Sequence, residues 1–224
     1  MPQTIEYLQQ KIDRELAWRK KELVGILRGA TRASASKVYY CRAGAVMLCA
    51  HWEGFLKKAV EIYVDFVFSQ QLSFSEMSCN FVAIAFYSDV VEAAKSSFPG
   101  SERHHLRLAK KIRDAASGPA RWEVTTRSNP SSEVLRELLS SIGIDSELGM
   151  GVSEWARTRT FIDALLLGER HKIAHGEGLR IDGDVLRERF GLMLDLCQSL
   201  ANAILDAAEG GTYQAGARFE AVSS

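Results

Sequence analysis

The sequence has few residues that break helices and no run of uncharged apolar residues long enough to cross a membrane. Only four prolines occur in 224 residues, and charged side chains interrupt even the most apolar stretch. The apolar segments are long and rich in Ala, Leu and Glu, which favour helices, rather than short and β-branched. The sequence therefore predicts an all-α protein without a membrane span and argues against an all-β sandwich.

The sequence also lacks an excess of either charge and lacks paired cysteines. Basic and acidic residues number 28 each, so the total gives no argument for a nucleic-acid partner. Two segments are nevertheless basic, 1–42 with a local charge of +5 and 101–127 with +4. Each is either a solvated helix face or a surface that attracts a polyanion. The four cysteines have no CxxC spacing and no signal-peptide pattern occurs, so we expect reduced thiols in a cytoplasmic protein.

Hydrophobic periodicity predicts how the chain is organised. Apolar residues recur every three to four positions, which is typical of amphipathic helices. The first two and last two long helices are expected to form a four-helix core, with a helical insertion between about 70 and 150. We predict one domain over 1–210 and a loose C-terminal tail over 211–224. The predicted helices cover 5–28, 36–69 (capped by Ser34 or Ser36), 75–97, 101–116, 134–142, 153–175 and 184–208.

Three residues near the end of one predicted helix could carry chemistry. The string RHKIAHGE places Arg170, His171 and His175 just before a glycine that ends the helix. Arginine binds a phosphate through two nitrogens, and histidine transfers protons near neutral pH. Together these residues suit phosphodiester cleavage. The spacing of Arg170 and His175 is common by chance, and a surface arginine with a histidine favoured by the helix dipole explains it equally well.

Other chemistries have weaker support. His171 and His175 lie four residues apart, as in some zinc sites, but such a site needs a third ligand, and HEXXH is absent because residue 172 is a lysine. No phosphate-binding glycine loop, nucleophile elbow or Cys-His protease pattern is present. Glu53, in the middle of the second helix, is either a polar neighbour of a core tryptophan or a carboxylate that orients Arg170. We therefore expect neither a metal nor a cofactor.

Three strings in the same order resemble the HEPN superfamily. CAHWEGFLK at 49–57, followed by Tyr63, is similar to the long second helix of a prokaryotic branch whose members include RNases. Ser128-Asn129-Pro130 and the following apolar residues up to Ile144 are similar to its middle region. RHKIAHGE supplies the Arg-x4-His motif, so the resemblance extends over about 38–208. It implies a HEPN-like helical bundle.

The resemblance also implies a function and its residues. Such proteins are metal-independent endoribonucleases that act as homodimers, with the Arg-x4-His helices facing a shared cleft, often as toxins or in anti-phage defence. Arg170 would bind the scissile phosphate and His175 would transfer protons, while His171 occupies a polar position where asparagine is more usual. A cognate antitoxin is a further partner to expect of a toxin. Some members are non-catalytic, so a HEPN module that binds nucleotide or protein is the alternative function.

An RNA substrate would explain the two basic segments. If RNA is the polyanion, at least one segment should line the approach to the cleft and bind the RNA backbone. The residues predicted to do so are Arg14 and Arg19 in the first segment and Lys110 and Lys111 in the second.

Overall fold

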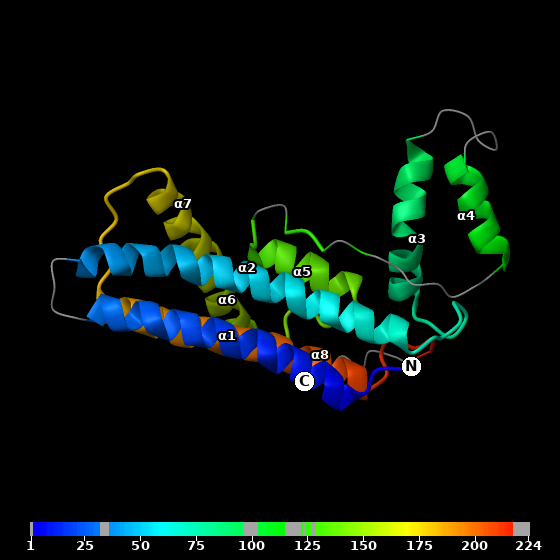
Figure 1. Cartoon of the computed structure of the whole chain (residues 1–224), viewed down its shortest axis with the longest axis horizontal. Coiled ribbons are helices and arrows are strands. Elements are labelled where there is room, and N and C mark those ends of the chain that lie inside the picture. The colour runs from blue at the N-terminus through cyan, green and yellow to red at the C-terminus, as the bar shows by residue number, and fades with distance from the viewer. Residues whose placement is uncertain are drawn as a thin grey trace.

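The computed structural model describes residues 2–31, 36–95, 103–114, 122, 124–126 and 129–216 (Figure 1). Their regular structure is helical, with no strand beyond one isolated bridge, so the all-α prediction is confirmed. In chain order the elements are α1 (Ile5–Thr31), α2 (Lys37–Ser69), α3 (Cys79–Ala94), α4 (Arg103–Asp114), α5 (Ser132–Ser141), α6 (Val152–Thr160), the π-helix η1 (Phe161–Gly168), α7 (Glu169–Ala174) and α8 (Gly183–Glu209).

The long helices α1, α2 and α8 pack side by side and enclose much of the core (Figure 1). Their apolar residues follow the predicted period, as Leu8, Ile12 and Leu23 do along α1. From α2, the rings of Trp52 and Phe55 are fully buried. Full burial of an apolar side chain such as Phe55 contributes about 1.5–3 kcal/mol, so the shared core stabilises the bundle. No helix among the described residues combines the length and hydropathy of a membrane span.

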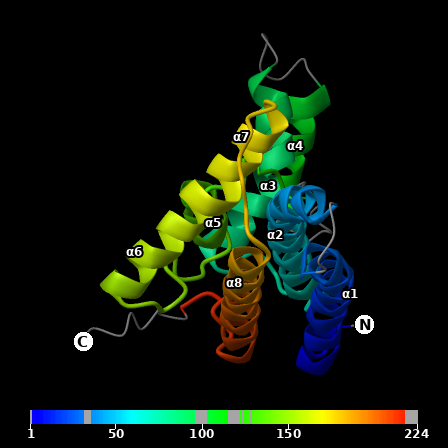
Figure 2. The same ribbon diagram turned by 90° about the vertical axis from the view of Figure 1, so that its left-hand side faces the viewer.

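The fourth member of the bundle is not the single regular helix that the sequence predicts over 153–175. It consists of α6, η1 and α7, which form one oblique run in Figure 2. A π-helix bonds each residue to the fifth one along, so residues five apart lie above one another. Segment η1 contacts α2, α6 and α7. The buried residues of η1 have that spacing, Phe161 with Leu166 and Ile162 with Leu167.

The predicted helical insertion contains α3, α4 and α5. Helices α3 and α4 pair to form an arm beyond the C-terminal end of α2, while α5 lies beside α2 (Figure 1). Trp52 fastens the start of the α5 region, because its Nε1 donates a hydrogen bond of 3.1 Å to the carbonyl of Pro130. The helix predicted over 75–97 begins later, at Cys79, and α3 ends at Ala94. Residues 96–102 and 115–121, which hold the other predicted ends, and the alternative cap Ser34 lie outside the described residues.

The chain after α8 returns to the connection between α2 and α3. The backbone N–H of Ser78 donates to the carbonyl of Tyr213 at 2.8 Å, and that of Ala215 donates to Glu76 at 2.8 Å. The Tyr213 ring is buried and stands edge-on to Phe66, with 5.9 Å between ring centroids. Within the predicted tail, Tyr213 thus packs against the bundle, while Gln214, Ala215 and Gly216 are exposed.

Candidate active site

Helix α7 carries Arg170 and His171 among its six residues, and His175 is the residue that caps its C-terminal end. The N–H of His175 donates to the His171 carbonyl at 2.9 Å. Gly176 then adopts a φ of +81°, a conformation that costs glycine little. Its N–H and that of Glu177 bond back to the last turn, at 3.1 Å and 2.9 Å. This Schellman motif satisfies the final carbonyls and fixes where His175 stands, as the helix stop predicted from the sequence requires.

The side chains of Arg170, His171 and His175 are available to a ligand. Arg170 is half-buried, and both histidines are exposed. None of the three forms a side-chain hydrogen bond or ion pair with any part of the chain that the structure describes. One cation and two imidazoles therefore lie close together in sequence at the end of α7 without a partner among the described residues.

Two arginines that the sequence reasoning missed hold this region in place. Arg189 of α8 forms an ion pair with Glu169, the first residue of α7, and both side chains are largely buried. Arg42 of α2 donates from Nη1 to the carbonyls of Glu177 and Leu179, at 2.8 Å and 3.1 Å. The start of α7 is thus tied to α8, and the loop after it is tied to α2.

Segment η1, directly before α7, has its own attachment. The Asp163 carboxylate accepts hydrogen bonds from the backbone N–H and the hydroxyl of Ser132, at 2.8 Å and 2.6 Å. Ser132 begins α5, so this contact joins the insertion to the run that carries Arg170. Single turns of π-helix occur often at functional sites, and here the π-helical segment leads directly into α7.

Glu53 lies near Arg170 without touching it. Its carboxylate accepts a hydrogen bond from the Thr126 hydroxyl, and no hydrogen bond or ion pair joins it to Arg170. Both residues act on the thiol of Cys49, one turn before Glu53 on α2. Burial raises the pKa of Cys49 to about 11, while the charge of Arg170 lowers it and that of Glu53 raises it. No contact that would orient Arg170 joins it to Glu53 in the part of the chain that the structure describes, and a role for Glu53 at the site stays a prediction.

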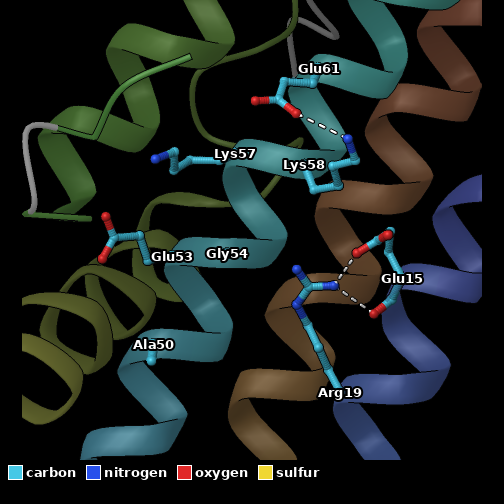
Figure 3. Close-up of a pocket in the computed structure, with 8 residues that line it drawn as sticks. All are labelled: Glu15, Arg19, Ala50, Glu53, Gly54, Lys57, Lys58 and Glu61. Carbon is cyan, nitrogen blue, oxygen red and sulfur yellow. Dashed lines mark hydrogen bonds and ion pairs between the residues drawn. The ribbon is translucent and has the colours of Figure 1, made fainter. Parts of the chain in front are cut away.

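A shallow groove of about 380 Å³ crosses the outer face of α2 beside Glu53 (Figure 3). Gly54 forms its floor, with Glu53 and Lys57 on one side of α2 and Arg19 of α1 on the other. A Cβ atom at Gly54 would lie 3.2 Å from Arg19 Nη2, so the glycine permits the close approach of the two helices. The complete lining is Glu15, Arg19, Ala50, Glu53, Gly54, Lys57, Lys58 and Glu61.

Comparison with known proteins identifies the family. A model of the RiboL-PSP-HEPN family matches residues 14–206. The chain belongs to this HEPN family. The match extends from α1 to α8 and includes the insertion and the Arg170–His175 segment. No curated protein and no solved structure gives a significant match. The resemblance to the HEPN superfamily is thus supported, and the RNase branch stays a prediction.

The HEPN bundle leaves two of the four predicted RNA-binding residues free and engages the other two. Arg14 and Lys110 are exposed and have no partner in the described chain. Arg19 is only 5 % exposed and donates to Glu15, both to its carboxylate at 2.5 Å and to its carbonyl at 2.7 Å. Lys111 donates to Asp89 at 3.0 Å and holds α4 on α3. Arg19 and Lys111 thus make contacts within the fold, and RNA binding by all four residues stays a prediction.

The metal alternative gains no ligand from the described residues. Among them, no group of three or more His, Cys, Asp or Glu side chains lies close enough to bind one ion. His171 and His175 are therefore two donors without a third in this part of the chain.

Proposed function

We propose that this HEPN protein is a metal-independent endoribonuclease. The observation that carries the proposal is a set of three unengaged side chains, Arg170 and His171 on α7 and His175 at its C-cap. The Glu169–Arg189 ion pair ties the start of this helix to α8. Members of the HEPN superfamily include RNases with an Arg-x4-His motif, and family membership adds weight to this assignment.

The chemistry needs only what these residues supply. RNA provides its own nucleophile, so the 2′-oxygen forms a bond to phosphorus and the bond to the 5′-oxygen breaks. A histidine accepts the proton of the 2′-hydroxyl, and a second proton donor protonates the departing 5′-oxygen. Arg170 stabilises the charge that develops on the phosphoryl oxygens. The products carry a 2′,3′-cyclic phosphate and a 5′-hydroxyl, and no metal-bound water takes part.

We assign unequal roles to the two histidines. His175 is our principal proton-transfer group, because it is the histidine of the Arg-x4-His motif. His171 assists, since it occupies a position that takes several polar residues in the resembling family. Glu53 positions Arg170 once substrate or a partner subunit is bound.

A homodimer would complete the site. One α7 supplies one arginine and two histidines, whereas two protomers across a two-fold axis supply twice that number to a shared cleft. Light scattering should give about twice the 24.9 kDa of the chain. A monomer that retains full activity would contradict this arrangement.

The decisive experiment measures cleavage of RNA by the purified full chain. Wild-type activity should survive EDTA, and Arg170→Ala and His175→Ala should each remove most of it, by about 100-fold or more. His171→Ala should cost less. Arg157→Ala is the matched control, because Arg157 is an exposed arginine on α6 that the mechanism does not use.

Two outcomes would overturn the proposal. Activity that survives both Arg170→Ala and His175→Ala would show that α7 is not the site, and activity lost on chelation would favour a metal-activated water. Intact RNA after incubation with the wild type would instead favour a non-catalytic module that binds nucleotide or protein. Circular dichroism of each variant confirms that the bundle is folded.

The biological setting we propose is that of a toxin or anti-phage effector in the cytoplasm, where cysteines stay reduced; all four here are free thiols. Expression should then arrest growth, His175→Ala should relieve the arrest, and a cognate antitoxin should suppress it. If cells that express catalytically active wild-type protein continue to grow, the protein is not a toxin, although it remains a ribonuclease.

A further inference from the structure

Helix α4 is the most basic element of the described chain. Some of its basic side chains pair with α3, and others are exposed without a partner on α3. The twelve residues of α4 carry five lysines or arginines against one carboxylate. None of its residues is buried, so α4 is not held in place by a packed apolar face. Ion pairs to α3 hold α4 in place. The basic residues that take no part in these ion pairs face the solvent.

Asp89 of α3 forms ion pairs with two of these five basic residues. Its carboxylate is buried and accepts hydrogen bonds from Arg107 at 2.7 Å and from Lys111 at 3.0 Å. Lys111 also lies over the ring of Phe86, 5.0 Å from its centroid. These contacts fix which side of α4 faces α3. They also explain why a strongly basic helix stays attached to the arm.

Three cations lie on the remaining surface of α4. Arg103 and Lys110 are exposed and form no hydrogen bond or ion pair in the described chain, while Arg113 pairs with its neighbour Asp114. Arg103 and Lys110 are seven residues apart, or two helical turns, and therefore lie on the same side of the helix. Leu106, between them, is 56 % exposed. This outward face of α4 combines unpaired positive charge with apolar surface.

The arm lies far from α7 in the same chain. Arg170 acts on Cys49 of α2, whereas the arm begins beyond Ser69, where α2 ends. Those 20 residues of helix span about 30 Å. Figure 1 shows α7 above the N-terminal half of α2 and the arm at its C-terminal end, and both rise on the same side of α2. A strand of about nine stacked nucleotides is needed to bridge that distance, at about 3.4 Å each.

We infer that the outward face of α4 binds the RNA backbone at a distance from the site, so that the chain holds long RNA more tightly than short RNA. The inference rests on the proposed function for its choice of polyanion. Unpaired cations two helical turns apart on one side of a helix complement the phosphates of an RNA backbone. The sequence predicts that at least one of the two basic segments lines the approach to the cleft. In this inference α4, which belongs to the second segment, instead forms a separate contact with RNA at a distance from the α7 of its own chain.

The test compares the affinities for long and short RNA. The double variant Arg103→Glu/Lys110→Glu reverses the two unpaired cations and keeps the Asp89 anchor. Its matched control is Arg157→Glu/Arg159→Glu, which reverses two exposed arginines on α6 and changes the net charge equally. Fluorescence anisotropy with 2′-O-methyl RNA of about 20 and about 4 nucleotides measures binding without cleavage, because the nucleophile is blocked.

The α4 variant should lose about tenfold or more of the ratio between the long and short affinities, and the control should keep that ratio. On single strands each phosphate contact contributes about 0.7 to the slope of log affinity against log salt, so the slope for long RNA should fall by about 1.4. An unchanged ratio, or an equal loss in the control, would overturn the inference. So would wild-type protein that binds vesicles of anionic lipid or an acidic protein through α4 and does not bind RNA there.

The two proposals fail separately. Wild-type protein that binds long 2′-O-methyl RNA through α4 but never cleaves unmodified RNA would refute the nuclease and leave the α4 contact standing. Protein that cleaves RNA but binds long and short RNA equally well would support the nuclease and refute the α4 contact.

Discussion

The ion pair between Glu169 and Arg189 is the contact whose loss should most disturb α7. Arg189→Met removes the charge but keeps much of the apolar stem, and it leaves Glu169 largely buried without a partner. Exposed ion pairs contribute about 0–1 kcal/mol, whereas removal of one partner from a buried pair costs about 3–5 kcal/mol. The side chains here are 14 % and 13 % exposed. We therefore expect a loss of about 2–3 kcal/mol, which lowers Tm by about 4–12 °C.

Arg187→Met is the control on the same helix. Arg187 pairs with Asp184, but those side chains are 57 % and 84 % exposed, so its loss should cost less than about 1 kcal/mol. Urea denaturation followed by circular dichroism gives both free energies of unfolding. Hydrogen exchange should also quicken in α7 for Arg189→Met and not for Arg187→Met, because the lost contact is at the start of α7.

A charge swap separates positioning from general stability. Glu169→Arg combined with Arg189→Glu restores a pair of opposite charges, so it should recover part of the stability and of the slow exchange in α7 that either single change removes. Under the proposed function, Arg189→Met should lower kcat more than it raises KM, and the swap should restore kcat in part. Equal destabilisation by Arg189→Met and Arg187→Met, or a swap no better than the worse single variant, would refute the reasoning.

Two further predictions concern the turn after α7 and the arm. Gly176→Ala should destabilise the chain by about 1–2 kcal/mol in urea, because alanine at a φ of +81° is strained, and unchanged stability would mean that the turn relaxes without cost. Burial acts to raise the pKa of Asp89, but Lys111 and Arg107 outweigh it, and the pKa in the folded chain is lowered. The stability from Asp89 should be fully present above about pH 4 and lost as the pH falls through the lowered value. Asp89→Asn should accordingly shift the urea midpoint at pH 7 more than at pH 3, and a constant shift would contradict this.

Much of the fold follows from hydrophobic period alone. In α1 and α8 the apolar residues repeat at helical spacing over 27 residues each, and such long, regular patterns leave little choice of structure. The run over 152–174 shows what the hydrophobic period cannot predict. Its buried pairs are five residues apart, and a helix assumed to have 3.6 residues per turn cannot be told from a π-helix until its packing on α2 is known.

The candidate site divides in the same way. Its helix end was predictable, because an apolar helix followed by Gly176 specifies a stop and places His175 on the last turn. Its surroundings were not. That Glu53 bonds to Thr126 and that Arg42 holds the loop at Glu177 are contacts across 73 and 135 residues, which no local pattern encodes.

Arg19 and Arg189 show which buried charges a sequence can reveal. Each stands where an apolar residue would continue the stripe, four residues before Leu23 and four before Met193. A charge at such a position predicts burial, and burial requires a partner. For Arg19 the partner is Glu15, four residues earlier on the same helix, which the spacing alone supplies. For Arg189 it is Glu169, on another helix, so the sequence can flag the residue but only the packing of α7 on α8 identifies its partner. The sequence thus shows Arg189 as a charged residue within the apolar stripe of α8. It does not show that Arg189 holds the start of α7 in place.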